Sequence, residues 1–284
     1  MAQLLFERQV EVIAQLISGT SIRKTEELTG VHRDTIMRLS LRVGAGCALI
    51  HDAFFQKLIV LRLELDETWS FVGKKQRKLK PSDPEFFGDQ YIFVALDATT
   101  RAVVSYWIGK RNSANTMNFI QDLKSRLVNV PMISSDSFQS YEEAVRQSFG
   151  EAVHYGQLIK MFKSPGTPSH GEDVPPPHDV AVLRKAAVIG NPDLQRVSTS
   201  LVERQNLTIR MNSRRMTRRT SGYSKKLENH LAAIHLHFAY YNFCRIHETI
   251  RTAPAHRLGV IERPWPLHQL IYVALNINLM QQAA

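Results

Sequence analysis

Three carboxylic acids occupy positions from which their side chains could meet: Asp66, Asp136 and Glu203. Asp66 lies in LDETWSF, residues 65–71, where apolar and polar residues alternate as they do in a β-strand. Asp136 ends the short apolar run VPMISSD, and Glu203 lies in SLVERQNL near the start of a basic, helix-like segment. Two acids on strands and one on a helix could form a cage of oxygen ligands for Mg²⁺, which prefers hard oxygen donors.

Such a cage suits phosphoryl transfer, because two divalent ions side by side stabilise both the attacking and the leaving oxygen. Three carboxylates are needed because the scissile phosphate supplies only part of the charge that balances two ions. The two acids of LDETWSF point in opposite directions, since successive side chains of a strand alternate between its faces. Glu67 shares the parity of the apolar residues and could be a salt-bridge partner, so Asp66 is the better candidate for an open site.

Each acid also has an ordinary structural interpretation. Asp66 could be a polar residue on the solvent face of its strand, and Asp136 could end its strand and cap the following helix. Ser200 and Glu203 have the spacing of a capping box, in which the glutamate reaches back to the first amide of the helix, and the local sequence alone favours that cap. Asp97, beside two threonines, is predicted to be a turn residue.

The elements around these acids predict an α/β core. A period of two begins at Leu61, the runs QYIFVALDA and AVVSYWIG indicate a hairpin, and SANTMNFIQDLKSRL and QSYEEAVRQSFG are predicted helices on either side of the strand that ends in Asp136. Strands that alternate with helices indicate a mixed sheet. Residues 163–195 are rich in proline, glycine and polar residues, which predicts a flexible insertion.

The first fifty residues are predicted to be helical and to contain a helix-turn-helix pattern. A helix from about Ile22 to Leu28, a turn over residues 29–31 and a helix from about Arg33 to Leu41 have the required lengths. The residues expected to pack inside this unit are Leu28, Val31, Ile36 and Leu39. The residues left free to contact DNA are Arg33, Thr35, Arg38 and Arg42.

The net charge of +10 over 284 residues favours a polyanionic partner, nucleic acid before an anionic membrane surface. No run of about 20 apolar residues predicts a membrane span, and the N-terminal segment does not resemble a signal peptide, so a cytoplasmic location is expected. Cys47 and Cys244 have neither the pattern of a disulfide framework nor the spacing of zinc ligands, and both are expected to be reduced and structural.

Several blocks of sequence carry a family resemblance. These are LDETWSF, the aspartate that ends SSD, and VSTSLVERQNLTIRM followed by GYSKKLENH and YYNFCRIHETIRTAPA. Together they resemble the DDE-type bacterial insertion-sequence transposases of the insertion-sequence-one-like family, over most of the chain. The VERQNL block with its downstream SKK and YNFCRIH runs is the most specific part. Ser137 departs from the pattern, since relatives often have a glycine after the second aspartate.

The resemblance implies an RNase H-like mixed-sheet catalytic core in which Asp66, Asp136 and Glu203 bind Mg²⁺, or Mn²⁺ in its place, as two ions. It also implies DNA as the partner, both element ends and target, in a homodimer or larger synaptic complex. The expected domains are an N-terminal helix-turn-helix domain over residues 1–50, the catalytic domain over 58–250 and a C-terminal tail over 251–284.

A basic residue commonly follows the glutamate of DDE enzymes by seven positions, and here that residue is Arg210. Seven residues make almost two helical turns, so Arg210 should share the face of Glu203. From Arg204 to Lys226 the chain has eight Lys or Arg residues and no acid. Because this run follows the third carboxylate, phosphate contacts are favoured over a merely solvated surface. The DNA-binding residues predicted here are Arg204, Arg210, Arg214, Arg215, Arg218 and Arg219.

The predicted function is a DNA transposase that binds the ends of an insertion sequence and catalyses metal-dependent 3′-end cleavage and strand transfer into target DNA. A catalytically inactive, transposase-derived DNA-binding regulator is the alternative; it explains the helix-turn-helix and the positive charge equally well, but not the three acids. A recombinase with a tyrosine or serine nucleophile is disfavoured because no His-x-x-Arg occurs beside a candidate tyrosine.

Overall fold

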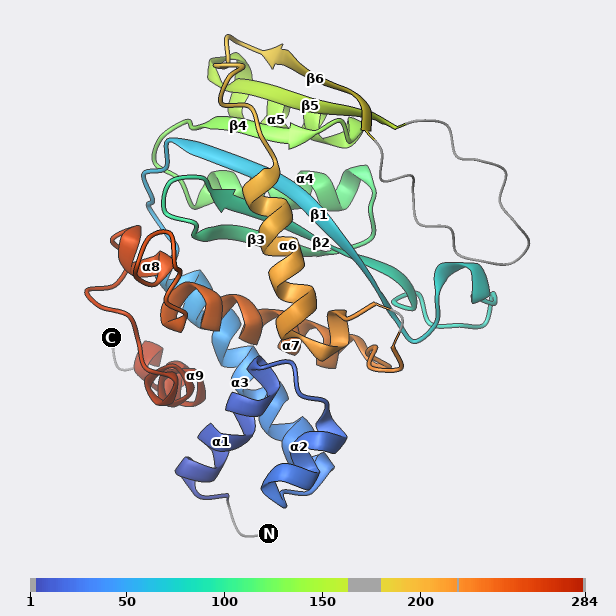
Figure 1. Ribbon diagram of the computed structural model, residues 1–284, viewed down its shortest axis with the longest axis vertical. Coiled ribbons are helices and arrows are strands. Elements are labelled where there is room, and N and C mark those ends of the chain that lie inside the picture. The colour runs from blue at the N-terminus through green and yellow to red at the C-terminus, as the bar shows by residue number, and fades with distance from the viewer. Residues whose placement is uncertain (1–3, 163–179, 219, 283–284) are drawn as a thin grey trace.

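A six-stranded mixed sheet forms the centre of the computed structural model, which describes residues 4–162, 180–218 and 220–282 (Figure 1). The strand order is β3-β2-β1-β4-β5-β6, with β4 parallel to β1 and to β5 and the other neighbours antiparallel. The first five strands have the order and directions of an RNase H-like core, so the predicted α/β fold class is confirmed. The strands are β1 (Arg62–Val72), β2 (Gly88–Asp97), β3 (Val103–Gly109), β4 (Met132–Asp136), β5 (His154–Phe162) and β6 (Val180–Ile189).

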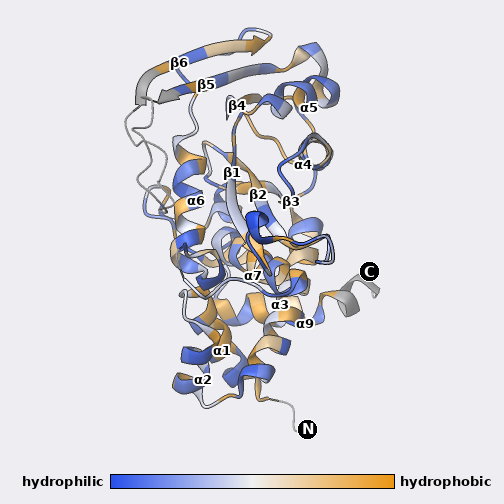
Figure 2. Cartoon of the chain, turned by 90° about the vertical axis from the view of Figure 1, so that its right-hand side faces the viewer, coloured by the Kyte–Doolittle hydropathy of each residue, from blue (hydrophilic) through white to orange (hydrophobic). Residues whose placement is uncertain are grey.

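Helices cover both faces of the sheet. α4 (Ser113–Ser125) and α5 (Gln139–Phe149) pack together on one face, and α6 (Ser200–Asn212) crosses the other face over β1 and β2 (Figures 1 and 2). On β1 the apolar Leu65 and the polar Thr68 are therefore both fully buried. The alternation that marks this strand in the sequence separates two buried layers, one apolar and one polar, rather than core and solvent.

The hairpin and the helices predicted around β4 are confirmed. β2 and β3 are joined by the turn in which the carboxylate of Asp97 accepts hydrogen bonds from the backbone amides of Thr99 (3.0 Å) and Thr100 (3.1 Å). Short 3₁₀ helices follow β1, α5 and α6; they cover Gln76–Lys78, Gly150–Ala152 and Arg214–Met216, respectively.

The N-terminal helices are α1 (Phe6–Ile17), α2 (Ile22–Thr29) and α3 (Arg33–Phe54). α2 ends at Gly30, whose φ of 66° lies in the left-handed region, which glycine adopts without strain. Ile36 and Leu39 are buried as predicted, but Leu28 is 53% exposed, so its predicted packing is wrong. The buried residues of α2 are Thr25 and Thr29, one turn apart, and Leu28 lies about 60° from Thr25 and about 100° from Thr29 around the helix.

α3 extends well beyond its predicted end near Leu41, because its second half packs against other helices rather than leading into a linker. A Cβ atom added at Gly44 would lie 2.6 Å from Ala232 of α7 (Leu227–Ala239), and one at Gly46 would lie 1.8 Å from the carbonyl oxygen of Ala274. These two glycines allow α3 to approach α7 and the C-terminal helix that contains Ala274 closely.

The region expected to be a C-terminal tail, residues 251–284, is largely helical in its described part. α7 continues as a π-helical turn (Tyr240–Cys244), and α8 (Pro254–Arg257) and α9 (Leu267–Gln282) follow. α9 buries Leu270 and Ile271 in the main core. Pro254 is the first residue of α8, and Pro264 and Pro266 precede α9.

The expected flexible insertion over residues 163–195 can be compared only in part. Residues 163–179 lie outside the described residues. Residues 180–189 form β6, which pairs with β5 and was not predicted. None of the helices in the described part of the chain is both long and apolar enough to cross a membrane.

Candidate active site

The three acids singled out from the sequence line one cavity of about 300 Å³. β1 and β4 are parallel and pair as far as Glu64 and Ser134, and Asp66 and Asp136 each follow two residues further along their strands, Asp136 at the carboxyl end of β4. Glu203 reaches the same cavity from the first turn of α6. The lining residues are Asp66, Asp136, Ser137, Leu158, Lys160 and Glu203.

The side chain of Asp66 is held by α6. Asn206 Nδ2 donates a hydrogen bond of 2.8 Å to Asp66 Oδ2. Glu67 points to the opposite face of β1, where it pairs with Arg111 and accepts a hydrogen bond of 3.0 Å from the hydroxyl of Tyr141. The opposite directions of the two acids and the salt bridge of Glu67 are therefore as the strand pattern indicated. Asn206 was not predicted, although it stands three residues after the third acid, one turn further along the helix.

Negative charge is concentrated around Asp66. Burial, followed by the charges of Glu67, Asp136 and Glu203, raises the pKa of Asp66 to about 7. The pKa of Glu67 is also raised. Burial and the charge of Asp136 raise it, and the charge of Arg111 partly offsets them. A divalent cation in the cavity would relieve this repulsion, because a nearby positive charge favours the ionised form of a carboxyl group.

Glu203 forms an ion pair with Lys160 and accepts a hydrogen bond of 2.6 Å from Thr199 Oγ1. As the side chains stand, no three His, Cys, Asp or Glu residues within the described ranges are arranged to hold a metal ion. The donor types nevertheless fit magnesium: three carboxylates line one cavity, next to Asn206, whose buried Oδ1 has no hydrogen-bond partner. To bind a metal ion in this cavity, Glu203 would have to exchange the ammonium of Lys160 for it.

A buried carboxylate that the sequence did not reveal attaches α6 to the sheet. Glu64 on β1 is 2% exposed, and its Oε2 accepts hydrogen bonds from the backbone amides of Leu201 (2.8 Å) and Val202 (3.2 Å). These first-turn amides have no partner inside the helix, and the helix dipole favours a negative charge beside them. The capping box suggested by Ser200 and Glu203 is not formed, and Glu203 remains available to the cavity.

Glu64→Ala is expected to lower the free energy of unfolding by about 2 kcal/mol, because two buried amides lose their acceptor and a void remains. Glu64→Gln keeps an acceptor oxygen and nearly the same volume, so its loss should stay below about 1 kcal/mol. Urea unfolding followed by circular dichroism measures both. Equal losses for the two variants would contradict the role given to the hydrogen bonds.

Arg210 lies beside the acids, as its seven-residue spacing from the glutamate predicted. Its Nη2 donates a hydrogen bond of 2.6 Å to Thr68 Oγ1, two residues along β1 from Asp66, and its buried Nε has no partner. Burial and Arg218 lower the pKa of Arg210, whereas Asp66 raises it. The guanidinium therefore lies within the electrostatic reach of the acidic cavity.

The other predicted DNA contacts in the basic segment differ in exposure. Arg204, Arg214 and Arg218 are exposed to solvent. Arg215 is half-buried and donates a hydrogen bond of 3.3 Å to Ser224 Oγ, and Arg219 lies outside the described residues.

The predicted contacts on α3 lie mostly at the surface. Arg33, Arg38 and Arg42 are exposed, and Thr35 is half-buried and accepts a hydrogen bond of 3.3 Å from Arg38 Nη2. Glu26 of α2 accepts a hydrogen bond of 2.9 Å from the amide of Arg33, which ties the start of α3 to the preceding helix.

The histidines of α7 and the two cysteines are buried or half-buried. His235 shares a hydrogen bond of 2.9 Å with the hydroxyl of Tyr106, and His237 shares one of 3.2 Å with Gln205, so the two histidines have different partners. Cys47 and Cys244 are free, and burial raises the pKa of both thiols.

Comparison with known proteins gives matches in sequence and in structure. Residues 59–161, which include the first two acids, match the model of the IS1 transposase family. The chain is 25% identical over 172 residues to the InsB protein of insertion element iso-IS1n from Shigella dysenteriae, covering 61% of this chain and 89% of that protein. Both matches agree with the resemblance carried by the sequence motifs.

Two solved structures are similar over different shares of the chain. A piggyBac transposase synaptic complex with hairpin DNA has a TM-score of 0.48 and 10% identity, covering 98% of this chain and 72% of that one. The Mos1 strand transfer complex has a TM-score of 0.22 and 16% identity, covering 52% and 57%. Scores this low do not establish a shared fold, so the fold assignment depends on the strand order alone.

Proposed function

We propose that this chain, an IS1-like transposase, cleaves DNA at the 3′ ends of an insertion sequence and joins the freed ends to target DNA, with Mg²⁺ held by Asp66, Asp136 and Glu203. One observation carries the proposal: acids from β1, β4 and α6, far apart in the sequence, line a single cavity. Clustering like charges in a partly buried site raises the free energy of the folded state, so a purely structural role does not account for it.

The residues divide the chemical work between them. Divalent ions bound by the three carboxylates would lower the pKa of the attacking water and stabilise charge on the leaving oxygen. Mn²⁺ can take the place of Mg²⁺ because both accept six oxygen ligands. Asn206 holds the carboxylate of Asp66 in one orientation, and the positive charge of Arg210, which acts on Asp66, would attract a phosphate beside the acids.

DNA binding is assigned to two surfaces. The exposed Arg33, Arg38 and Arg42 of α3, with Thr35, are proposed to contact the element ends, as the second helix of a helix-turn-helix does. The exposed Arg204, Arg214 and Arg218 are proposed to hold the DNA backbone near the acids. Because an element has two ends, we propose that at least two copies act together.

The competing function is a DNA-binding regulator without activity, and a cleavage assay separates the two. The substrate is a labelled duplex that carries the inverted repeat flanking the coding sequence of this protein. We expect a nicked strand with a 3′-hydroxyl in Mg²⁺ or Mn²⁺ and none in EDTA. Tight binding of the same duplex without cleavage in either metal would favour the regulator.

Lys160→Met is expected to tighten Mn²⁺ binding by about 5-fold, because Glu203 no longer has to leave a partly exposed ion pair worth about 1 kcal/mol. A Mn²⁺ titration followed by electron paramagnetic resonance measures the change. Lys185→Met on β6 is the matched control, because its ammonium donates to the backbone carbonyl of Gln195 at 3.0 Å. Unchanged affinity in Lys160→Met would show that the ion pair does not compete with the metal.

A further inference from the structure

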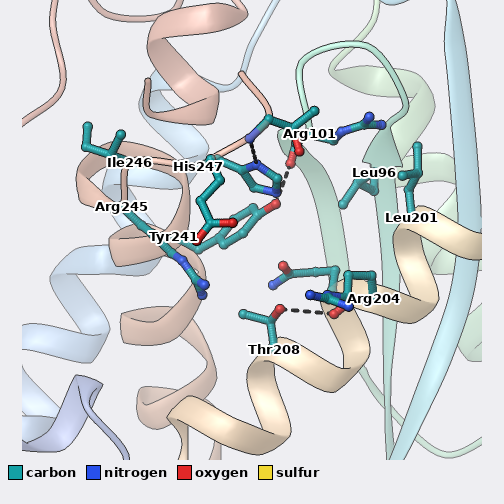
Figure 3. A pocket seen from close by; sticks show the side chains of 12 residues that line it. Leu96, Arg101, Leu201, Arg204, Thr208, Tyr241, Arg245, Ile246 and His247 are labelled. Atoms are coloured by element: carbon teal, nitrogen blue, oxygen red, sulfur yellow. Dashed lines mark hydrogen bonds between the residues drawn. The ribbon is translucent and has the colours of Figure 1, made fainter. Parts of the chain in front are cut away.

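A second cavity, of about 320 Å³, lies beside α6, and Figure 3 shows the residues that line it. Its walls are α6, the turn between β2 and β3 that contains Arg101, and residues 245–249 after α7. Glu203 and Arg210 project from one flank of α6 and the cavity-lining residues from the other, because a helix turns by about 100° per residue. The residues of α6 that line the second cavity recur at helical spacing: Leu201, Arg204, Gln205 and Thr208.

Three arginines from separate elements reach this cavity. Figure 3 shows Arg204 on α6 and Arg245 after α7 extending into the space between these elements, with Arg101 on the turn above them. Arg101 Nη1 donates to the carbonyl of Ala98 at 2.5 Å. Within the described residues, none of the three guanidinium groups has a carboxylate within ion-pairing distance. The one acid among the lining residues, Glu248, is exposed.

The neighbouring titratable groups experience this positive charge. The pKa of His247 is lowered by burial, then by Arg101 and Arg245, and also by Arg204, while Glu248 raises it. The hydroxyl of Tyr241 is held in place by a hydrogen bond of 2.9 Å to the carbonyl of Arg101. The cavity is thus electropositive, with its walls fixed by contacts between separate elements.

Uncompensated guanidinium groups around a cavity select an anion with several oxygens, because each planar group can donate two parallel hydrogen bonds to a phosphate. The volume exceeds that of one phosphate group, and the apolar side chains of Leu96, Leu201 and Ile246 line the remainder. A phosphate joined to a sugar and base satisfies both parts of this surface, since the sugar and base have apolar faces.

We propose that this cavity binds one nucleotide unit of the DNA strand that is cleaved in the acidic cavity, with its phosphate between Arg204 and Arg245 and with Arg101 adding positive charge at the cavity wall. The inference rests on the proposed function for the path of the strand. The two flanks of α6 are separated by a helix diameter of about 10–12 Å. At a rise of about 3.4 Å per nucleotide, the bound phosphate lies about three nucleotides from the scissile one.

Methylphosphonate scanning of the substrate tests the proposal. Single uncharged linkages are placed one at a time within about six positions of the cleavage site, and duplex binding is measured by fluorescence anisotropy in EDTA, where no cleavage occurs. In the native protein we expect one linkage about three nucleotides from the cleavage site to weaken binding by about 10-fold. In Arg245→Gln and Arg204→Gln, the duplex should bind about 10-fold more weakly and that linkage should cause no further loss.

The surface Arg263, which lines neither cavity, is the control: Arg263→Gln should keep the native pattern of the scan. Thermal unfolding identifies any variant that fails to fold, and Arg245→Lys, which keeps the charge, should restore part of the affinity. Equal penalties at every linkage in native protein and variants would overturn the inference. So would tight binding of free deoxynucleoside monophosphate that depends on Arg245 without any coupling in the duplex.

The two proposals fail in different ways. If the native protein cleaves element ends but the arginine variants leave the scan unchanged, this inference fails and the proposed function stands. If the coupling is present but no metal supports cleavage, the cavity is a DNA contact of an inactive binder and the proposed function fails.

Discussion

Asp66→Asn, Asp136→Asn and Glu203→Gln are each expected to lower strand cleavage and strand transfer by about 10³-fold or more. Each change removes a negative oxygen ligand while keeping the size of the side chain. The loss corresponds to about 4 kcal/mol of transition-state stabilisation, the order expected when a catalytic metal is displaced. The measurement is single-turnover cleavage of the labelled element end in Mg²⁺ and in Mn²⁺.

The same variants should bind the uncleaved duplex with native or slightly higher affinity, because removing negative charge reduces repulsion of the phosphate backbone. Asp193→Asn is the matched control, since Asp193 is exposed, pairs with Arg196 and lines neither cavity. Native cleavage in any one of the three variants would remove that residue from the catalytic site. Loss of duplex binding in all three would mean that the acids support the fold rather than the reaction.

Asn206→Ala is expected to raise the Mg²⁺ concentration needed for half-maximal cleavage by about 10- to 100-fold, the range for residues that orient a metal ligand. Its amide donates to Asp66 Oδ2, so its loss frees the carboxylate to rotate and leaves it without that hydrogen bond. Cleavage rates measured across a Mg²⁺ titration separate a loss of Mg²⁺ affinity from a loss of catalytic rate. The rate at saturating Mg²⁺ should fall less than the apparent affinity for Mg²⁺.

Asn212→Ala is the control for this prediction, because Asn212 belongs to the same helix and its amide donates to the backbone carbonyl of Thr208 at 3.0 Å. It should leave the Mg²⁺ dependence unchanged. A fall in the saturating rate of Asn206→Ala with no change in Mg²⁺ dependence would exclude a role in orienting Asp66 and would indicate a direct contact with DNA.

Two of the three acids that line the cavity, Asp66 and Asp136, were predictable because each carries a local signal. Strand alternation assigns Asp66 to the face opposite Glu67, and a short apolar run identifies Asp136 as the end of a strand. For Glu203 the local sequence favoured a capping box, and only the resemblance to a family pointed to a metal ligand. The spacing of Arg210 from the glutamate follows from helix geometry and required no tertiary information.

The residues that support the site were not predictable, because their roles depend on which elements cross. Glu64 and Asn206 look like ordinary polar residues until α6 is placed over β1, where Glu64 accepts from the first amides of the helix and Asn206 donates to Asp66. Lys160 gave no signal because β5 was not recognised as a strand. β6 follows a proline-rich stretch whose composition suggested that the whole of residues 163–195 would lack structure.

The cluster of arginines at the second cavity could not be predicted from the sequence either. Arg204 was predicted to contact DNA from its place in a basic run, but Arg101 lies in the turn between β2 and β3 and Arg245 in the segment after α7, both outside that run. Only the meeting of the β2–β3 turn, α6 and the residues after α7 brings their charges together.

The proposed function requires Asp66, Asp136 and Glu203 to bind catalytic divalent ions together. The most direct measurement is the anomalous diffraction of Mn²⁺ in crystals of the protein bound to an element end. We expect anomalous peaks inside the acidic cavity, with carboxylate oxygens of all three residues at about 2.0–2.2 Å and Glu203 released from Lys160. Mn²⁺ bound elsewhere on the chain, under conditions in which the same complex cleaves its DNA, would contradict the account.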